Sequence, residues 1–187
     1  YRIKMKKTYI FLFIIFCITI SLLIYFEKNK NNSQINNAQD QKLFDPKNSS
    51  FIIDSQTIKL NNGKYETYSA PSSNSKNITT YFGNEAEGDL NRDGLKDIAF
   101  LVTQDTGGSG LFYYVVVALN SDSGYKTTNA FFIGDRIAPQ STEIKSGELH
   151  VNYAERRPGQ PMSSQPDQGA VLLLKVNSKG ALEGLMK

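Results

Sequence analysis

Residues 98–120 read IAFLVTQDTGGSGLFYYVVVALN and contain the two runs that decide the fold. Both runs are short and rich in β-branched and aromatic residues, a composition that favours β-strands. Residues 115–119 (VVVAL) show no polar alternation, which is typical of a central strand covered on both faces. The glycines between the runs indicate a flexible hairpin loop, because a phosphate-binding loop would need Gly-Lys-Ser/Thr at the start of a helix.

The same pattern continues outward through residues 51–187, where short apolar runs alternate with clusters of Asn, Gly, Ser and Pro. The sequence Asn61-Asn62-Gly63 predicts a hairpin turn between residues 57–60 and 64–68, because Asn-Gly accepts a positive φ. Ser146-Gly147 predicts a second turn, between residues 142–145 and 149–156. Since no stretch forms a persuasive amphipathic helix, we predict an all-β domain built as a compact antiparallel sheet or sandwich.

An uncharged apolar segment, TYIFLFIIFCITISLLIYF, occupies residues 8–26. As a helix, this segment would span about 28 Å, close to the ~30 Å hydrocarbon core of a bilayer. Residues 1–7 form a flank with four basic residues and no acid. The positive-inside rule places this flank in the cytoplasm and the rest of the chain outside. We therefore predict one N-terminal transmembrane helix that anchors the protein in the cell membrane, with a cleaved signal peptide as the alternative.

We predict a disordered polar linker over residues 27–50, which read EKNKNNSQINNAQDQKLFDPKNSS. The segment contains too few apolar side chains to form a core. The extracytoplasmic β domain is then expected over residues 51–187. Of the 21 basic residues, 17 follow the basic flank, and the same part of the chain contains all 18 acidic residues. The body of the protein is therefore nearly neutral. Such a body offers no basic face for phosphate groups, and we predict no nucleic-acid partner.

Residues 89–97 read DLNRDGLKD and form the sharpest chemical motif of the sequence. Oxygen-bearing side chains recur at positions 1, 3, 5 and 9, a glycine at position 6 permits a sharp turn, and a backbone carbonyl falls at position 7. Calcium takes about six to eight oxygen ligands, and a tightly curled loop with this spacing directs its oxygens to one centre. We predict a structural Ca²⁺ site whose ligands are Asp89, Asn91, Asp93, the carbonyl of Leu95, and Asp97.

The motif departs from an EF-hand, because Phe100 stands where the bidentate ligand would lie and a strand follows the loop. Asp97 would then have to supply the closing carboxylate. Arg92 and Lys96 fall between ligand positions and are expected to point outward to solvent. The alternative is a polar turn between two strands, with acidic residues that serve only solubility.

Residues 85–125 resemble a single repeat of the FG-GAP/VCBS type, with GDLNRDGLKDIAF at 88–100, YVVVAL at 114–119 and SDSG at 121–124. Such repeats are extracellular calcium-loop strand pairs, usually found as β-propeller blades in adhesins and integrin-like proteins. The sequence holds one copy, whereas a propeller needs several, and the family's usual Asp at the second ligand is Asn91 here. A wider stretch is similar to small extracytoplasmic bacterial proteins. The resemblance implies secretion and calcium binding and suggests nothing catalytic.

Two arginine-containing pairs, Asp135-Arg136 and Arg156-Arg157, each end an apolar strand and precede a loop with proline. Guanidinium groups at the base of such loops could bind the carboxylate or phosphate of a ligand. They could equally pair with nearby carboxylates, such as Asp167, and hold the loops in place. The sequence therefore leaves a ligand-binding role and a structural role open for Asp135, Arg136, Arg156 and Arg157.

Cysteine and histidine each occur once, which excludes a disulfide framework, a multi-Cys zinc site and a multi-His metal centre. The single histidine, His150, is expected on the solvent face of a strand, and no catalytic residue is assigned. We predict a membrane-anchored extracytoplasmic binding or interaction module, with a cell-envelope protein or carbohydrate as its ligand. The alternative is a cell-envelope enzyme or enzyme inhibitor that acts through the arginine-lined loops.

Overall fold

The computed structural model describes residues 18–28, 44–69 and 74–185, and the chain divides into two compact units, Tyr1–Leu43 and Phe44–Lys187. In the first unit, residues 18–28 are helical and their apolar side chains, such as Leu23 and Phe26, are exposed. Residues 1–17 of the predicted basic flank and membrane segment, and 29–43 of the predicted linker, lie outside the described residues. Within the described ranges, no helix combines the length and the apolar character needed to cross a bilayer.

The second unit is built from antiparallel strands, which confirms the all-β prediction. The strands Asp97–Asp105 and Phe112–Leu119 coincide with the two apolar runs of residues 98–120, and Gly- or Asn-containing turns with positive φ separate several of the strands. In chain order the elements are the 3-10 helix η1 (Pro46–Asn48) and the strands β1 (Ser50–Ile53), β2 (Gln56–Lys59), β3 (Lys64–Tyr68), β4 (Lys76–Gly88), β5 (Asp97–Asp105), β6 (Phe112–Leu119), β7 (Lys126–Thr127), β8 (Phe131–Asp135), β9 (Ala138–Lys145), β10 (Glu148–Glu155), β11 (Gln168–Val176) and β12 (Leu182–Gly184).

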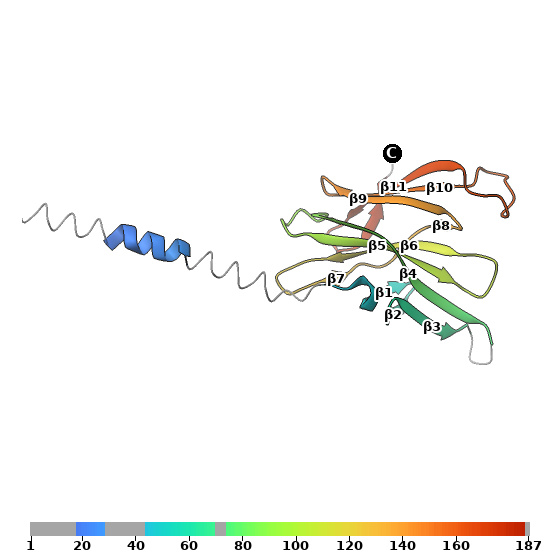
Figure 1. Ribbon diagram of the computed structural model, residues 1–187, viewed down its shortest axis with the longest axis horizontal. Helices are drawn as coiled ribbons and strands as arrows, with labels where there is room; N and C mark the ends of the chain where they lie inside the picture. Colours follow the sequence, from blue (N-terminus) through green and yellow to red (C-terminus); the bar gives the residue numbers. More distant parts are fainter. Residues whose placement is uncertain (1–17, 29–43, 70–73, 186–187) are drawn as a thin grey trace, which may run out of the picture. The chain divides into compact units, whose positions relative to one another are not determined.

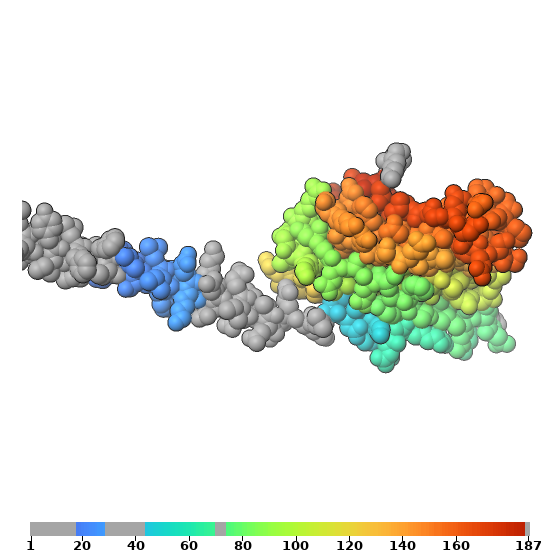
Figure 2. Space-filling model, turned by 45° about the horizontal axis from the view of Figure 1, so that its top comes forward, coloured from blue at the N-terminus to red at the C-terminus, as the bar shows by residue number. Residues whose placement is uncertain are grey.

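The strands form three sheets. A six-stranded sheet has the order β3-β4-β5-β6-β7, with β8 also paired to β6, and a four-stranded sheet has the order β12-β11-β10-β9. The third sheet is the pair β1-β2. Figure 1 shows β9, β10 and β11 on one side of β4–β6, and β1 and β2 on the other side. In Figure 2 the orange and red segments of the four-stranded sheet form a continuous band beside the green segments of the larger sheet.

Two hydrophobic cores lie on opposite faces of β5 and β6. The core against the four-stranded sheet contains Ala99, Leu101, Val115 and Val117 together with Leu149, Val151 and Leu174. The core beneath the β1–β2 pair contains Phe100, Val102, Tyr114 and Val116 together with Phe51, Ile53, Ile58 and Leu60. Successive residues of β6 therefore point into different cores, as the alternation of a strand requires. The prediction of a central strand covered on both faces is confirmed.

The second unit begins at Phe44 rather than at Phe51. The ring of Phe44 lies 5.1 Å from that of Tyr125 and 6.2 Å from that of Phe100, measured between centroids. The carboxylate of Asp45 accepts a 2.9 Å hydrogen bond from the Lys47 amide at the start of η1. Residues 44–50, predicted as the end of the linker, thus belong to the domain, because one apolar anchor and one cap hold them in place.

The first predicted hairpin differs from the structure in its pairing. The turn itself is present, with Asn62 and Gly63 at φ 50° and 83° and a bridge between Asn61 and Lys64. Beyond this bridge the flanking strands separate, because β2 pairs with β1 while β3 pairs with β4. The buried side chains of Ile58 and Leu60 draw β2 into the second core. The second predicted turn, at Ser146-Gly147, joins β9 and β10 as expected.

Candidate calcium-binding loop

The loop of residues 89–97 connects β4 to β5. It begins where the end of β4 packs against β9 of the four-stranded sheet. A Cβ atom on Gly88 would lie 2.7 Å from the Cβ of Ile144 in β9, a separation too short for two carbon atoms. Glycine at position 88 therefore allows β4 to approach β9 closely immediately before the loop begins.

The polar side chains of the loop fold back onto its own backbone amides. The carboxylate of Asp89 accepts hydrogen bonds from the amides of Asp93, at 3.1 Å, and Gly94, at 2.9 Å. The side-chain oxygen of Asn91 also accepts from Asp93 N at 3.1 Å, and Asp93 Oδ1 accepts from Leu95 N at 2.8 Å. The oxygens at positions 1, 3 and 5 are thus gathered around residues 93–95.

Two residues of the loop adopt left-handed backbone conformations, which make this curl possible. Gly94 has a φ of 87°, as the sixth position of the motif requires, and Arg92 has a φ of 64°. A side chain is disfavoured at such a φ, so the surrounding contacts must hold Arg92 in place. The amide group of Asn91 also donates a 2.8 Å hydrogen bond to Asp93 Oδ2.

Asp97 differs from the other predicted ligands because it is completely buried. Its Oδ2 accepts a 2.9 Å hydrogen bond from Leu90 N, and its Oδ1 accepts a 2.8 Å hydrogen bond from Asn120 N. Burial raises the pKa of Asp97, the nearby Asp93 charge adds to this effect, and the backbone hydrogen bonds oppose it. Asp97 therefore fastens the start of the loop to the turn that follows β6, a role that the sequence motif did not reveal.

The structure brings Asp89, Asn91 and Asp93 together at the exposed side of the loop and places Asp97 beneath it. Across residues 18–28, 44–69 and 74–185, no three or more His, Cys, Asp and Glu side chains form a group that could hold a metal ion. The predicted side-chain donors, an amide and carboxylates, thus lie on two sides of one turn. The remaining predicted donor is the backbone carbonyl of Leu95.

The two basic residues of the loop differ in their surroundings. Lys96 is exposed and its ammonium group lies 3.6 Å from the Glu87 carboxylate. Arg92 instead donates a 2.7 Å hydrogen bond from Nη2 to the backbone carbonyl of Ser146, between β9 and β10. Both residues are exposed, as expected, but Arg92 also reaches the second sheet, which supplies an acceptor 54 residues away in sequence.

The arginine-containing region lies at the other end of β5. Asp135 and Arg136 form an ion pair with 2.7 Å between Oδ2 and Nη2, and Asp135 Oδ1 accepts a 2.9 Å hydrogen bond from Leu111 N. Hydrogen bonding to the Arg136 guanidinium lowers the pKa of Asp135, although burial opposes the shift. With β5 running from Asp97 to Asp105, this region is about 26 Å from the candidate calcium loop at ~3.3 Å per residue.

Arg156 connects two of the loops at this end of the domain. Its Nε donates a 2.6 Å hydrogen bond to the carbonyl of Ser164, and its Nη1 donates a 2.8 Å hydrogen bond to the carbonyl of Arg136. The ion pair between Arg157 and Asp167 is longer, at 3.2 Å, and more exposed. Arg136 thus pairs with a carboxylate, as in the structural alternative, whereas Arg156 donates to backbone carbonyls of two loops, and a ligand-binding role for these residues stays a prediction.

Replacing Asp135 with asparagine is expected to lower the free energy of unfolding by about 1 kcal/mol at pH 7. Because the folded-state pKa of Asp135 is lowered, the stabilisation is present above the ordinary value of 3.8 and is lost as the pH falls below it. The difference between variant and wild type in urea unfolding should therefore narrow from pH 7 to pH 3. The exposed Asp167→Asn variant is the control and should change stability by a few tenths of a kcal/mol at most. An equal loss for Asp135→Asn at both pH values would contradict the ion-pair assignment.

Comparisons with known proteins do not extend these observations: no family model matches the chain, and no curated protein or solved structure matches it. The resemblance of residues 85–125 to an FG-GAP/VCBS repeat accordingly stays a prediction from sequence.

Proposed function

We propose that this protein is a membrane-anchored extracytoplasmic interaction module whose 89–97 loop binds one Ca²⁺ ion in a structural role. The observation that carries the proposal is the set of oxygen-bearing side chains at positions 1, 3, 5 and 9 of a loop that curls back on itself. Carboxylates, amides and backbone carbonyls are the ligands that Ca²⁺ uses in proteins.

The charges of the loop also favour a bound cation. Asp89, Asp93 and Asp97 bring three carboxylates to one turn, and burial raises the pKa of Asp97, with a smaller contribution from the repulsion of Asp93. A divalent cation would relieve this repulsion and leave a net charge of about −1. We propose that Asp89, Asn91, Asp93 and the carbonyl of Leu95 are the ligands on the exposed side, with Asp97 contributing from beneath.

A structural role for the ion follows from where the loop is attached. Asp97 joins the loop to the turn after β6, and Gly88 packs against β9. An ion held by this loop would therefore fix a junction between both large sheets. This is the arrangement expected of a stabilising ion, because it ties segments that are distant in sequence.

The membrane and extracytoplasmic parts of the proposal rest on the sequence of residues 1–26, in which a basic flank precedes an uncharged apolar segment. Anchored in this way, the β domain would meet a cell-envelope protein or carbohydrate. The alternative of an envelope enzyme or inhibitor acting through Arg136 and Arg156 has less support, because both guanidinium groups donate to neighbouring protein oxygens.

Isothermal titration calorimetry on the full chain in a non-ionic detergent tests the calcium site. We expect one Ca²⁺ to bind in preference to Mg²⁺, and Asp93→Ala to weaken binding at least about tenfold by removing a ligand. Asp167→Ala, which removes an equal charge from an exposed position in the region at the other end of β5, is the matched control and should bind like wild type. Unchanged affinity in Asp93→Ala, or no binding to the wild-type chain, would contradict the assignment.

A further inference from the structure

The turn between β9 and β10 presents a backbone acceptor to the 89–97 loop. Lys145 and Glu148 are paired in register, and the two residues between them, Ser146 and Gly147, have φ values of 54° and 77°. Two positive φ values in a two-residue connection define a tight type I′ turn. The Ser146 carbonyl of this turn accepts the 2.7 Å hydrogen bond from Arg92.

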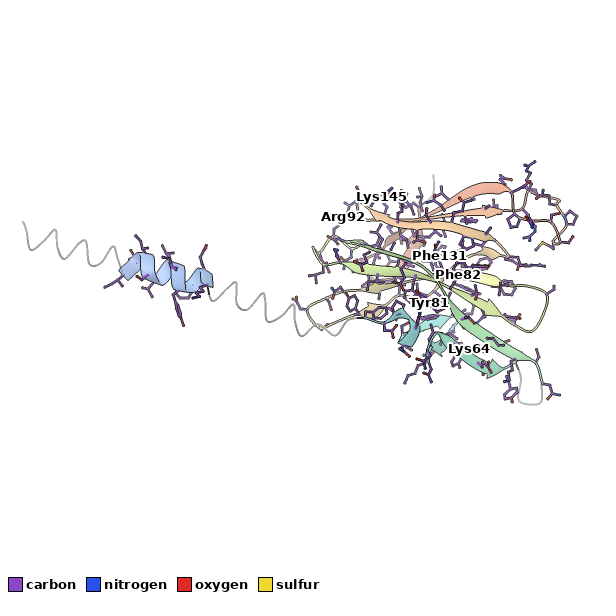
Figure 3. All side chains as sticks on the ribbon, viewed as in Figure 1. Lys64, Tyr81, Phe82, Arg92, Phe131 and Lys145 are labelled. Atoms are coloured by element: carbon purple, nitrogen blue, oxygen red, sulfur yellow. The ribbon has the colours of Figure 1, made fainter. Side chains whose placement is uncertain are left out.

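The aliphatic stem of Arg92 lies directly on the same turn. A Cβ atom on Gly147 would fall 2.3 Å from Arg92 Nε, 3.1 Å from its Cγ and 3.2 Å from its Cδ. Glycine at position 147 therefore makes room for the arginine as well as permitting the turn. Figure 3 shows Arg92 and Lys145 at the same corner of the domain.

Arg92 stands between Asn91 and Asp93, two of the proposed ligands, and its left-handed φ of 64° sets the direction in which both leave the backbone. A left-handed conformation is unfavourable at a residue other than glycine, so the docked side chain helps to maintain it. The contact of Arg92 with the β9–β10 turn thus affects the conformation at the centre of the 89–97 loop.

We propose that Arg92 positions the loop for calcium by docking it on the β9–β10 turn, and that calcium binding in turn stiffens this turn. The inference rests on the proposed calcium site and adds a positioning residue that is not a ligand. Thermodynamic linkage requires the coupling to be reciprocal: if the docked turn favours ion binding, the bound ion must favour the docked turn.

The direction in which calcium affinity changes distinguishes a positioning role of Arg92 from a simple effect of its charge. A cation near Ca²⁺ repels it, so removing a positive charge alone should leave calcium affinity unchanged or raise it. Lys96→Ala tests this charge effect, because Lys96 is an exposed cation of the same loop whose carboxylate partner is Glu87. Arg92→Ala removes the same charge and also the docking contact, and it should weaken calcium binding about 3- to 10-fold.

Calorimetry on the full chain in detergent compares wild type, Lys96→Ala, Arg92→Ala and Arg92→Lys, with Ca²⁺ as the titrant. Arg92→Lys, which keeps the charge and a donor, should recover much of the lost affinity. If Arg92→Ala binds as tightly as Lys96→Ala, the positioning role is overturned while the calcium site stands. If wild type binds no calcium, the proposed function fails and this inference fails with it.

Hydrogen exchange supplies a readout that a merely structural arginine would not move. In wild type, calcium should slow exchange of the backbone amides of residues 145–148, which are not part of the loop. In Arg92→Ala the same amides should exchange at one rate with and without calcium, while Lys96→Ala should behave like wild type. Calcium-dependent protection of the turn that persists in Arg92→Ala would overturn the coupling.

Discussion

Replacing Asp97 with alanine is expected to lower the free energy of unfolding by about 2–5 kcal/mol, even in EDTA. The change removes the two hydrogen bonds that the buried carboxylate accepts from Leu90 N and Asn120 N, and each such loss costs about 1–3 kcal/mol. Removing a buried carboxylate whose pKa is raised returns part of that cost, which keeps the total below the upper limit. Because the chain has no tryptophan, urea unfolding is best followed by circular dichroism.

The matched control for Asp97→Ala is Asp93→Ala in the same loop. Asp93 is exposed, so its loss leaves no buried donor and should change stability in EDTA by less than about 1 kcal/mol. Asp97→Asn retains the shape and one acceptor oxygen, and its stability should fall between those of wild type and Asp97→Ala. Equal stabilities for Asp97→Ala and Asp93→Ala in EDTA would show that the two amide contacts of Asp97 are unimportant.

Calcium itself is expected to stabilise the wild-type domain by about 2.7 kcal/mol when the free ion reaches ~100 times its dissociation constant. For a domain of this size, the unfolding midpoint should rise by roughly 8–12 °C between EDTA and calcium. Magnesium should give a much smaller shift, because it prefers a rigid octahedral shell and retains its waters. The measurement is thermal unfolding by circular dichroism at matched ionic strength.

The Asp93→Ala variant separates ion binding from loop structure in this second experiment. It should unfold close to wild type in EDTA and lose most of the calcium-dependent rise, whereas Asp97→Ala should be destabilised in both conditions. A rise of equal size in Asp93→Ala and wild type would place any calcium effect elsewhere in the chain. A wild-type midpoint that calcium does not move would reduce the loop to a polar turn.

The sequence predicted those parts of the fold for which the local pattern of residues is sufficient. The uninterrupted apolar run Val115–Val117 indicated a strand that is buried on both faces. Ser146-Gly147 indicated a tight turn because glycine tolerates the positive φ values that such a turn needs. The partner of β2 was not predictable in this way, because a tight turn at Asn62-Gly63 is compatible with flanking strands that separate. Only the buried positions of Ile58 and Leu60 in the finished core decide where β2 goes.

The loop shows the same limit at the level of single residues. Spacing in sequence placed Asp89, Asn91, Asp93 and Asp97 in one turn but did not indicate which side of the turn faces the sheet. Asp97 is the first residue of β5, a strand that is covered on both faces, so its side chain lies in the interior. The contact of Arg92 depends on a hairpin far along the chain and has no local signal.

The attachment of the β1–β2 pair has a mechanical consequence. Among the described residues, the pair meets the segment between β7 and β8 through the isolated parallel bridge Ile52–Asn129 and a 2.9 Å hydrogen bond from Ala130 N to Ile52 O, and the Thr127 hydroxyl of β7 donates to the Ser50 carbonyl. A tensile load that enters the domain at Phe44 is therefore opposed by side-chain packing and a few isolated hydrogen bonds, and over the described part of the chain no continuous ladder of backbone bonds joins this pair to the six-stranded sheet. Under such a load we expect this layer to detach before the central strands separate, which would expose Phe100 and Val116 of the core beneath it.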